Sequence, residues 1–403
     1  MFSFGKPRVE LGVVFDIGSS SVGAALALFE KGIPSRVVYD VREPISLQEK
    51  PEPGRFFDDM LSALGRVNAI VLKDGLATLS AADRSSLSIR HVAYIFSSPW
   101  SVSQTKTVTI NKYDAFTFTR AMVNEIIEDS EKIFAKSIRE DGLSDLPGGL
   151  SIIEKRVIHI ALNGYQVPEP YGKKTRRADM SFFMSFAPKA VIDRISEVSM
   201  STFHPRDTKI FSAPLVAFSV IRDSFHNTDD FVFLDVGGEI SEVSVIKGGL
   251  ILETISFPTG FRSLVRSVAA DFFVTYTEAE SLINLDASGH GDDSVRERLV
   301  PAVDRAAQAW SDAFHKALSG LSTRMSMPRE LFASADSDLV RFLVGAIKDE
   351  RVSQFGVAEV PFFVTLLSPD KLKDLVVFAP TAQKDMSIAL AVGFIGRSGL
   401  ESY

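Results

Sequence analysis

The chain has 403 residues, of which 45% are hydrophobic and 24% charged, proportions typical of a globular protein rather than a disordered or fibrous one. Its length favours two or more domains, because a single hydrophobic core stops growing at about 250–300 residues. The net charge of −7 argues against a nucleic-acid partner, and the absence of cysteine excludes disulfides, thiol nucleophiles and cysteine metal sites.

Targeting and metal signals are also missing from the sequence. No apolar run reaches the length of about 18 residues that a membrane-spanning helix needs, and the first residues lack the apolar segment of a secretory signal. The six histidines are scattered, with no pair spaced to place two ligands on one helix face. We therefore expect a cytoplasmic protein without a zinc site.

The first expected elements are three strands joined by tight turns. Leu11–Phe15 is a short apolar run that ends in an Asp-x-Gly turn, and Val22–Phe29 and Arg36–Val41 follow it. In such a turn glycine lets backbone N–H groups approach a phosphate, and the neighbouring carboxylate can hold Mg²⁺ through water. One turn of this kind is weak support, because Asp-Gly hairpins are also common structural features.

The middle of the sequence predicts a small inserted unit. A helix is expected to begin at Thr119, and a second one after Pro188. Strand-like runs surround them at residues 91–96, 105–110, 157–162 and 180–186. We therefore expect residues 87–186 to form an α+β subdomain inserted into the first half of the chain.

The strand-and-turn pattern returns about two hundred residues later. An apolar run ends in DVGGE, and a second apolar run follows. Asp16 aligns with Asp235, and Gly18 with Gly237, at one offset without a gap. This repeat indicates an internal duplication and predicts two lobes whose turns face each other across a cleft.

A helical region and then a long helix are expected after the second turn. Residues 261–283 are helical in pattern, and apolar residues from Leu299 to Leu318 recur at intervals of three and four, which predicts an amphipathic helix with a buried face. An apolar segment follows at residues 386–395. The expected domains are a first lobe of residues 1–86 and 187–222, packed also by a C-terminal helix at 385–403, the insert at 87–186, and a second lobe of residues 223–384.

The two turns, DIGSSSVGAALAL and DVGGEISEVSVIKGGLI, resemble the phosphate motifs of the actin-like ATPase superfamily, and most closely those of the bacterial FtsA and PilM proteins. FPTG, which ends at Gly260, and the stretch from Asn163 to Phe186 are similar to further segments of those proteins. The resemblance implies an α/β, actin-like (ribonuclease H-like) fold of duplicated lobes around a nucleotide cleft. It also implies an inserted α+β subdomain of the SHS2 type in the first lobe.

The same resemblance implies a site for ATP with Mg²⁺. The residues that match the family's first motif are Asp16, Gly18, Ser19, Ser20 and Ser21, and those on the opposite side are Asp235, Gly237, Gly238, Glu242, Gly260 and Ser334. Asp16 and Asp235 would be the magnesium carboxylates. The structural alternative for each aspartate is a turn residue that caps the end of a strand.

Departures from the family pattern predict weak or lost hydrolysis. Ser21 and Gly23 stand where relatives commonly carry a lysine, and Glu239 replaces a glycine and adds a carboxylate where a polyanion should lie. Ala213 precedes Pro214, where many relatives carry the side chain that orients water. The stretch LFASADSD lacks the Gly-Gly turn expected near adenosine. Phosphoryl transfer depends mostly on positioned charge, so such a site should be a poor catalyst.

We expect a scaffold or adaptor of a membrane-attached bacterial machine, either a PilM-like pilus platform or an FtsA-like division assembly. Such a protein binds a protein partner of an inner-membrane assembly, so that membrane contact is indirect. Self-assembly through residues 87–186 is a further expectation. The alternatives are an active ATPase or small-molecule kinase of the same superfamily, and a nucleotide-dependent filament.

Overall fold

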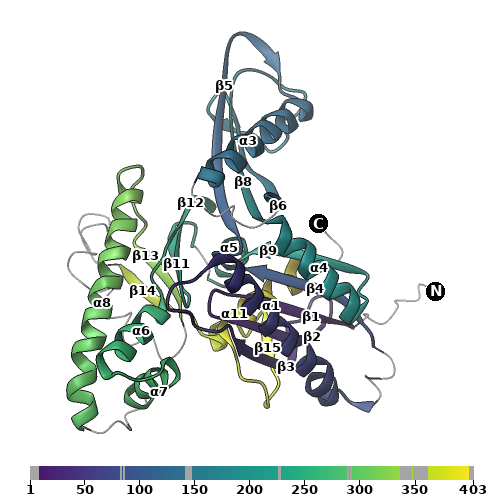
Figure 1. The fold of residues 1–403 in the computed structure, drawn as a ribbon. Helices are drawn as coiled ribbons and strands as arrows, with labels where there is room; N and C mark the ends of the chain where they lie inside the picture. Colours follow the sequence, from purple (N-terminus) through teal and green to yellow (C-terminus); the bar gives the residue numbers. More distant parts are fainter. Residues whose placement is uncertain are drawn as a thin grey trace.

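The computed structural model describes residues 9–81, 84, 87–140, 148–225, 228–287, 290, 293–335, 347 and 362–398. Figure 1 shows two lobes that lie side by side and a third unit that projects away from both of them. Each of the three units is built around its own β-sheet. The sheets therefore define the architecture of the chain.

The first lobe contains a sheet in the strand order β15-β3-β2-β1-β4-β9. β1, β2 and β3 form an antiparallel meander, β4 pairs in parallel with β1, and β9 pairs in parallel with β4. The strands are β1 (Glu10–Ile17), β2 (Ser21–Phe29), β3 (Ser35–Pro44), β4 (Ile89–Phe96), β9 (Asp207–Ser212) and β15 (Val376–Phe378). The predicted meander is present.

Helices cover both faces of this sheet, and its central strands are therefore apolar nearly throughout. Alternate residues of β1 point to opposite faces, so Val13 and Phe15 pack with α1 and α4, whereas Val14 packs with α5 and α11. The helical elements are α1 (Pro53–Ile70), η1 (Val71–Gly75), η2 (Leu76–Thr78), α4 (Lys189–Phe203), α5 (Ala213–Ser224), η5 (Pro369–Leu372) and α11 (Met386–Ser398).

The second lobe repeats this plan in a sheet of order β12-β11-β10-β13-β14. β10 pairs antiparallel with β11 and parallel with β13, as β1 does with β2 and β4. The elements are β10 (Phe231–Val236), β11 (Ser241–Lys247), β12 (Leu250–Phe257), α6 (Phe261–Phe272), α7 (Tyr276–Ala287), α8 (Asp293–Ser322), β13 (Glu330–Ala335) and β14 (Phe363–Leu366). The predicted duplicated α/β lobes are thus confirmed.

The long helix α8 is the predicted amphipathic helix. Trp310 and Phe314 stack with their ring centroids 5.0 Å apart, and both are buried against Val232 and Leu234 of β10. Trp310 Nε1 also donates a hydrogen bond to Ser241 Oγ at 3.0 Å, which satisfies the indole inside the core. The apolar stripe is therefore the core of the second lobe.

The projecting unit has a sheet of order β5-β8-β6-β7 with α3 packed on it (Figure 1). Its elements are β5 (Val102–Thr117), α3 (Arg120–Glu140), β6 (Leu150–Leu162), β7 (Tyr165–Gln166) and β8 (Lys174–Pro188). As predicted, α3 follows Thr119, whose Oγ1 accepts a hydrogen bond from Met122 N at 3.3 Å.

The predicted start of the insert at residue 87 differs from this arrangement. β4 belongs to the first-lobe sheet, where Ala93 pairs with Val14 of β1, so the projecting sheet begins only at Val102. The sequence pattern placed this boundary too early because β4 is a short apolar run like the strands of the insert. A single sequence does not say which sheet such a run joins.

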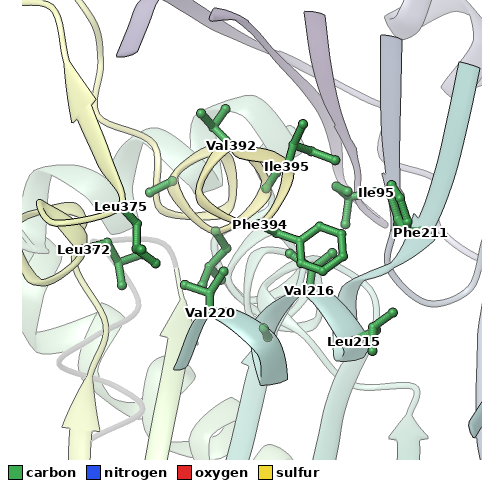
Figure 2. Close-up of a cluster of buried hydrophobic side chains, with 14 of the residues drawn as sticks. Ile95, Phe211, Leu215, Val216, Val220, Leu372, Leu375, Val392, Phe394 and Ile395 are labelled. Atoms are coloured by element: carbon green, nitrogen blue, oxygen red, sulfur yellow. The ribbon is translucent and has the colours of Figure 1, made fainter. Parts of the chain in front are cut away.

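The helix α11 returns to the first lobe from the far end of the chain. Figure 2 shows Val392, Phe394 and Ile395 of α11 beside Val216 and Val220 of α5 in one buried cluster. The Phe394 ring also meets the Phe211 ring of β9 edge-on, at a centroid distance of 5.0 Å. This cluster fixes the position of the residues just before α11, which reach the site described next.

Candidate functional site

The two Asp-x-Gly turns have the same hydrogen-bonded form. In the first, Gly18 N donates to Ser21 O at 3.0 Å, and in the second, Gly237 N donates to Ile240 O at 3.1 Å. Trp100 Nε1 donates to Gly18 O at 2.7 Å and supports the first turn from the connection between β4 and β5. The duplication therefore extends to the backbone of the turns.

A hollow between the lobes brings together all of the predicted site residues except Gly260. Its lining includes Asp16, Gly18, Ser19, Ser20, Ser21, Asp235, Gly237, Gly238, Glu242 and Ser334. Gly260 lies behind the second turn, where an added Cβ would overlap the carbonyl oxygens of Gly237 and Gly238. Ser334, the residue before the end of β13, pairs with Asp235 of β10, and residues 336–338, part of the stretch expected near adenosine, lie outside the described residues.

Arg42, on β3, supplies a positive charge that the sequence reasoning missed. Its guanidinium donates to Asp16 Oδ2 at 2.8 Å, to Ser21 Oγ at 2.9 Å and to Asp385 Oδ2 at 2.5 Å. The guanidinium crosses Gly23, its neighbour on β2, where an added Cβ would lie 2.8 Å from Arg42 Nη2. The sequence showed no replacement for the lysine that relatives commonly carry near this turn. The structure corrects this expectation, because Gly23 makes room for an arginine from the next strand.

Asp385 connects this ion pair to α11. Its Oδ1 accepts a hydrogen bond from Ile388 N at 2.9 Å and caps the helix. Burial by itself raises the pKa of Asp385, but the charge and hydrogen bond of Arg42, together with the backbone N–H groups of Ile388 and Ser387, outweigh burial, so its pKa is lowered. Arg42 is therefore held between two carboxylates of the first lobe.

Glu239 has a different role from the one its position suggested. The sequence reading placed it as a carboxylate that repels a polyanion. In the structure, Glu239 Oε1 accepts from Arg266 Nη2 at 2.7 Å and from Arg262 Nη1 at 3.4 Å, and its Oε2 accepts from Arg266 Nη1 at 2.9 Å. Its charge is therefore paired inside the second lobe, and it orients two arginines of α6.

Both of these arginines reach across to the first lobe. Arg262 Nη2 donates to the carbonyl oxygens of Ser20, at 2.9 Å, and Ile45. Arg266 donates to Gln48 O from Nη2 at 2.7 Å and from Nε at 3.0 Å. Arg262 is only 6% exposed, so its contacts are shielded from water and strong, whereas Arg266 is partly exposed. The two arginines fasten the lobes to each other.

The turns themselves are also in direct contact. Glu239 N donates to Ser19 Oγ at 3.0 Å, and the Cα of Gly238 lies against the side chain of Ser20, where an added Cβ would overlap it. Because the turns touch, the hollow between them holds only about 60 Å³. Sites for small molecules and cofactors typically hold about 300–1,000 Å³.

Glu242 and Asp235 are cross-strand partners at the edge of the hollow. Burial raises the pKa of Glu242 to about 8, and the negative charge of Asp235 contributes in the same direction. Glu242 is therefore mostly protonated at neutral pH, and the pair carries less negative charge than two ionised carboxylates.

Mg²⁺ with ATP, the cofactor that the resemblance implies, does not fit this seam. Asp16, the expected magnesium carboxylate, is already paired with Arg42, and the space between the turns is too small for a triphosphate. Across the described residues, no three carboxylate or histidine side chains come together as a metal site. The contacts around this hollow can therefore hold the two lobes together, but the hollow has no room for a triphosphate.

A second and larger hollow, which we call the junction pocket, lies where β6 and β8 of the insert meet α5, α11 and β12. It holds about 520 Å³, within the range of ligand sites. Its apolar lining includes Phe183, Leu215, Phe218, Ile251 and Phe394. No short motif marks it in the sequence, because it is assembled from five separate elements.

The charged lining of the junction pocket is mostly basic. Arg156, Arg222 and Arg397 line it together with one carboxylate, Asp223. Asp223 pairs with Arg397 at 3.1 Å and with Arg222 at 3.3 Å, and the Arg222 guanidinium lies 5.0 Å above the ring of Phe218. The pocket thus combines an apolar floor with an excess of positive charge.

Comparison with solved structures identifies the architecture. The chain superposes on a chain of a PilM–PilN type IV pilus biogenesis complex with a TM-score of 0.65 and 13% sequence identity, over 98% of this chain and 100% of that one. The fold is actin-like. At this identity the likeness shows the actin-like fold alone, and it confirms the predicted fold class.

Two further solved structures match with lower scores. One is the ethanolamine utilization protein EutJ from Carboxydothermus hydrogenoformans, with a TM-score of 0.42, 13% identity, and coverage of 97% of this chain and 90% of that chain. The other is a protein of unknown function with an actin-like ATPase fold from Bacteroides thetaiotaomicron, with a TM-score of 0.41, 9% identity, and coverage of 97% and 98%. No protein-family model and no curated protein matches the sequence.

Proposed function

We propose that this actin-like protein is an adaptor of a membrane-attached bacterial assembly, of the PilM type, and that it holds a segment of its partner in the junction pocket. The observation that carries the proposal is a pocket of about 520 Å³ at the meeting point of the insert and both lobes, in a chain whose seam between the phosphate turns is closed. The solved structure that matches this chain with a TM-score of 0.65 is that of a PilM–PilN type IV pilus biogenesis complex.

The chemistry of the pocket indicates the kind of segment it would take. Phe183, Leu215 and Phe394 give an apolar floor for apolar side chains. Arg156 and Arg397 at its edge favour a segment that also carries acidic residues, because complementary charge steers and orients a partner. We therefore propose a short apolar segment with one or more Asp or Glu residues as the partner's binding element.

The proposed location is the cytoplasmic side of the inner membrane. None of the helices among the described residues is long and apolar enough to cross a bilayer. In the proposed arrangement the partner, rather than this chain, provides the attachment to the membrane. A pilus platform is the assembly we propose, and a division assembly of the FtsA type is the alternative.

The proposed adaptor does not hydrolyse ATP. The carboxylates that line the hollow between the lobes are Asp16, Asp235, Glu242 and Asp385. Two of them are paired with Arg42, and the raised pKa of Glu242 keeps it mostly protonated, so these three carboxylates are poorly suited to accept a proton from an attacking water. An active ATPase or kinase is therefore the less favoured reading.

The proposal is tested by capture from solubilised membranes of the host cell with full-length protein and matched variants. Arg156→Glu with Arg397→Glu reverses the charge of the junction pocket, and Arg305→Glu reverses an exposed charge on α8 as a control. We expect the native protein and the control to capture a membrane protein of the pilus platform with an acidic, apolar cytoplasmic segment. Equal capture by the pocket variant would reject this site, and capture of a division protein would favour the alternative assembly.

Self-assembly through the projecting unit is a second proposal, supported by its exposed aromatic residues. Tyr113 of β5 is 94% exposed and Tyr165 of β7 is 78% exposed, and such side chains are common in protein interfaces. Sedimentation of the native protein and of Tyr113→Ser with Tyr165→Ser tests it. A native protein that stays monomeric at high concentration would exclude self-assembly.

A further inference from the structure

We propose that arginines built into this chain take the place of Mg-ATP in closing the two lobes, so that the closed form is the resting state and requires no nucleotide. The inference goes beyond the proposed partner binding, because it concerns the conformation of the lobes with or without a partner. It rests on the disagreement between the cofactor that the fold implies and the residues that fill the seam.

The first part of the inference is the neutralisation of Asp16. The guanidinium of Arg42 lies 2.8 Å from Asp16 Oδ2 and 2.5 Å from Asp385 Oδ2. A planar guanidinium can bind two carboxylates at once through separate N–H groups and is always charged. It therefore supplies, from β3, the positive charge that a bound cation would bring to this carboxylate.

The second part is the bridge between the lobes. Arg262 and Arg266 of α6 donate to carbonyl oxygens of the first lobe, at Ser20 and Gln48 among others. Glu239 pairs with both arginines, so its negative charge offsets part of their positive charge beside the buried Arg262. A ligand that bridges two lobes stabilises closure only through contacts that the open form lacks, and here the protein supplies such contacts itself.

The third part is the contact between the turns. Gly238 lies against Ser20, and Ser19 Oγ accepts a hydrogen bond from Glu239 N at 3.0 Å. A triphosphate could enter only after these contacts and the Arg42–Asp16 pair had been broken. Part of the binding free energy of the triphosphate would therefore be needed to open the seam. We expect no measurable binding at millimolar Mg-ATP.

The test uses the absence of cysteine in the chain, which allows two labels to be placed at chosen positions. Asp58→Cys on α1 and Thr277→Cys on α7 put exposed labels on the first and second lobes. Distances between spin labels at these positions report the separation of the lobes. The labelled full-length protein is measured with and without Mg-ATP, and calorimetric titration with Mg-ATP accompanies it.

We expect one narrow distance distribution that Mg-ATP does not change, and a titration heat no larger than that of dilution. Arg262→Ala with Arg266→Ala should broaden the distribution towards longer distances, whereas the exposed control Arg305→Ala should not. If the double variant fails to fold, Glu239→Gln carries the same test, because it leaves both arginines without their counter-charge.

Two results would overturn the inference. The first is a broad distribution in the native protein that Mg-ATP narrows, or saturable binding of Mg-ATP. The second is a folded arginine or Glu239 variant whose distribution stays as narrow as that of the native protein. Capture of a partner at the junction pocket is measured in a separate experiment, so failure of this inference and failure of the proposed binding site can be distinguished.

Discussion

Ser20 and Gly238 lie against each other across the seam of the lobes, close enough that Gly238 has no room for a side chain. We predict that Gly238→Ala lowers the free energy of unfolding by about 1–3 kcal/mol, because the new methyl group overlaps Ser20 and must push the turns apart. Gly320→Ala is the matched control: Gly320 lies in α8 with open space around it, and alanine there should add about 0.5–1 kcal/mol. Urea unfolding followed by circular dichroism measures both changes, and equal stability of the two variants would contradict the tight seam.

The ion pair between Arg42 and Asp16 gives a second prediction. Arg42→Gln leaves Asp16 and Asp385 without their cation inside the fold, so we expect a loss of about 2 kcal/mol of unfolding free energy. Arg66, which pairs with Glu43 and whose side chain is 47% exposed, provides the control. Arg66→Gln should cost less than about 1 kcal/mol, because exposed ion pairs contribute little. A smaller effect at Arg42 than at Arg66 would show that its charge is not needed at this place.

Glu154 predicts the pH dependence of stability. It lies buried between the insert and the first lobe, where its Oε2 accepts from Ser212 Oγ at 2.6 Å and from Ser212 N at 3.2 Å, while Oε1 has no hydrogen-bond partner in the described part of the chain. Burial raises its pKa from the usual 4.5 to about 7, against the opposing effect of these hydrogen bonds. The folded protein therefore holds this proton more tightly than the unfolded chain does.

Stability from this proton is complete below pH 4.5 and is lost as the pH rises through 7. Between these values, Glu154 should make the unfolding free energy fall by at most about 1.4 kcal/mol per pH unit. Glu154→Gln keeps the shape of the side chain and removes the titration, so its stability should fall less steeply between pH 5 and pH 7. Thermal unfolding at a series of pH values measures the slope, and the same slope in both proteins would contradict the raised pKa.

The aromatic packing around α11 gives a fourth prediction. Phe394→Ala should cost about 3–5 kcal/mol, because it removes a buried ring from the cluster that holds α11 to α5 and β9 (Figure 2). The control is Tyr113→Ala, at a side chain that is 94% exposed. Phe394 also lines the junction pocket, so partner capture and thermal stability should fall together in Phe394→Ala but not in Tyr113→Ala.

Much of the fold could be predicted because its elements carry local signals. The duplication of the Asp-x-Gly turns predicted two similar lobes, and the spacing of Trp310 and Phe314 predicted the buried face of α8. The strand β4 was assigned to the insert because pairing between strands is a long-range property. The helix α1 was not predicted, although Pro53 at its first turn is a typical start signal.

The candidate site could be predicted only in part. The sequence named the residues of the two turns, and the structure brings all except Gly260 to one hollow. Arg42 was missed because it reaches Asp16 from another strand. The available signal was the glycine at position 23, because a glycine inside a strand often marks a place where another group approaches closely. Arg262 and Arg266 change the meaning of Glu239 from a repulsive charge to a partner, and only their placement on α6 shows this.

A crystal structure grown in the presence of millimolar Mg-ATP tests nucleotide-free closure most directly. We predict that Arg42 remains hydrogen-bonded to Asp16 and that Ser20 remains in contact with Gly238, with no triphosphate between the turns. A triphosphate bound between the two turns, with Arg42 moved away from Asp16 and the lobes separated, would contradict it.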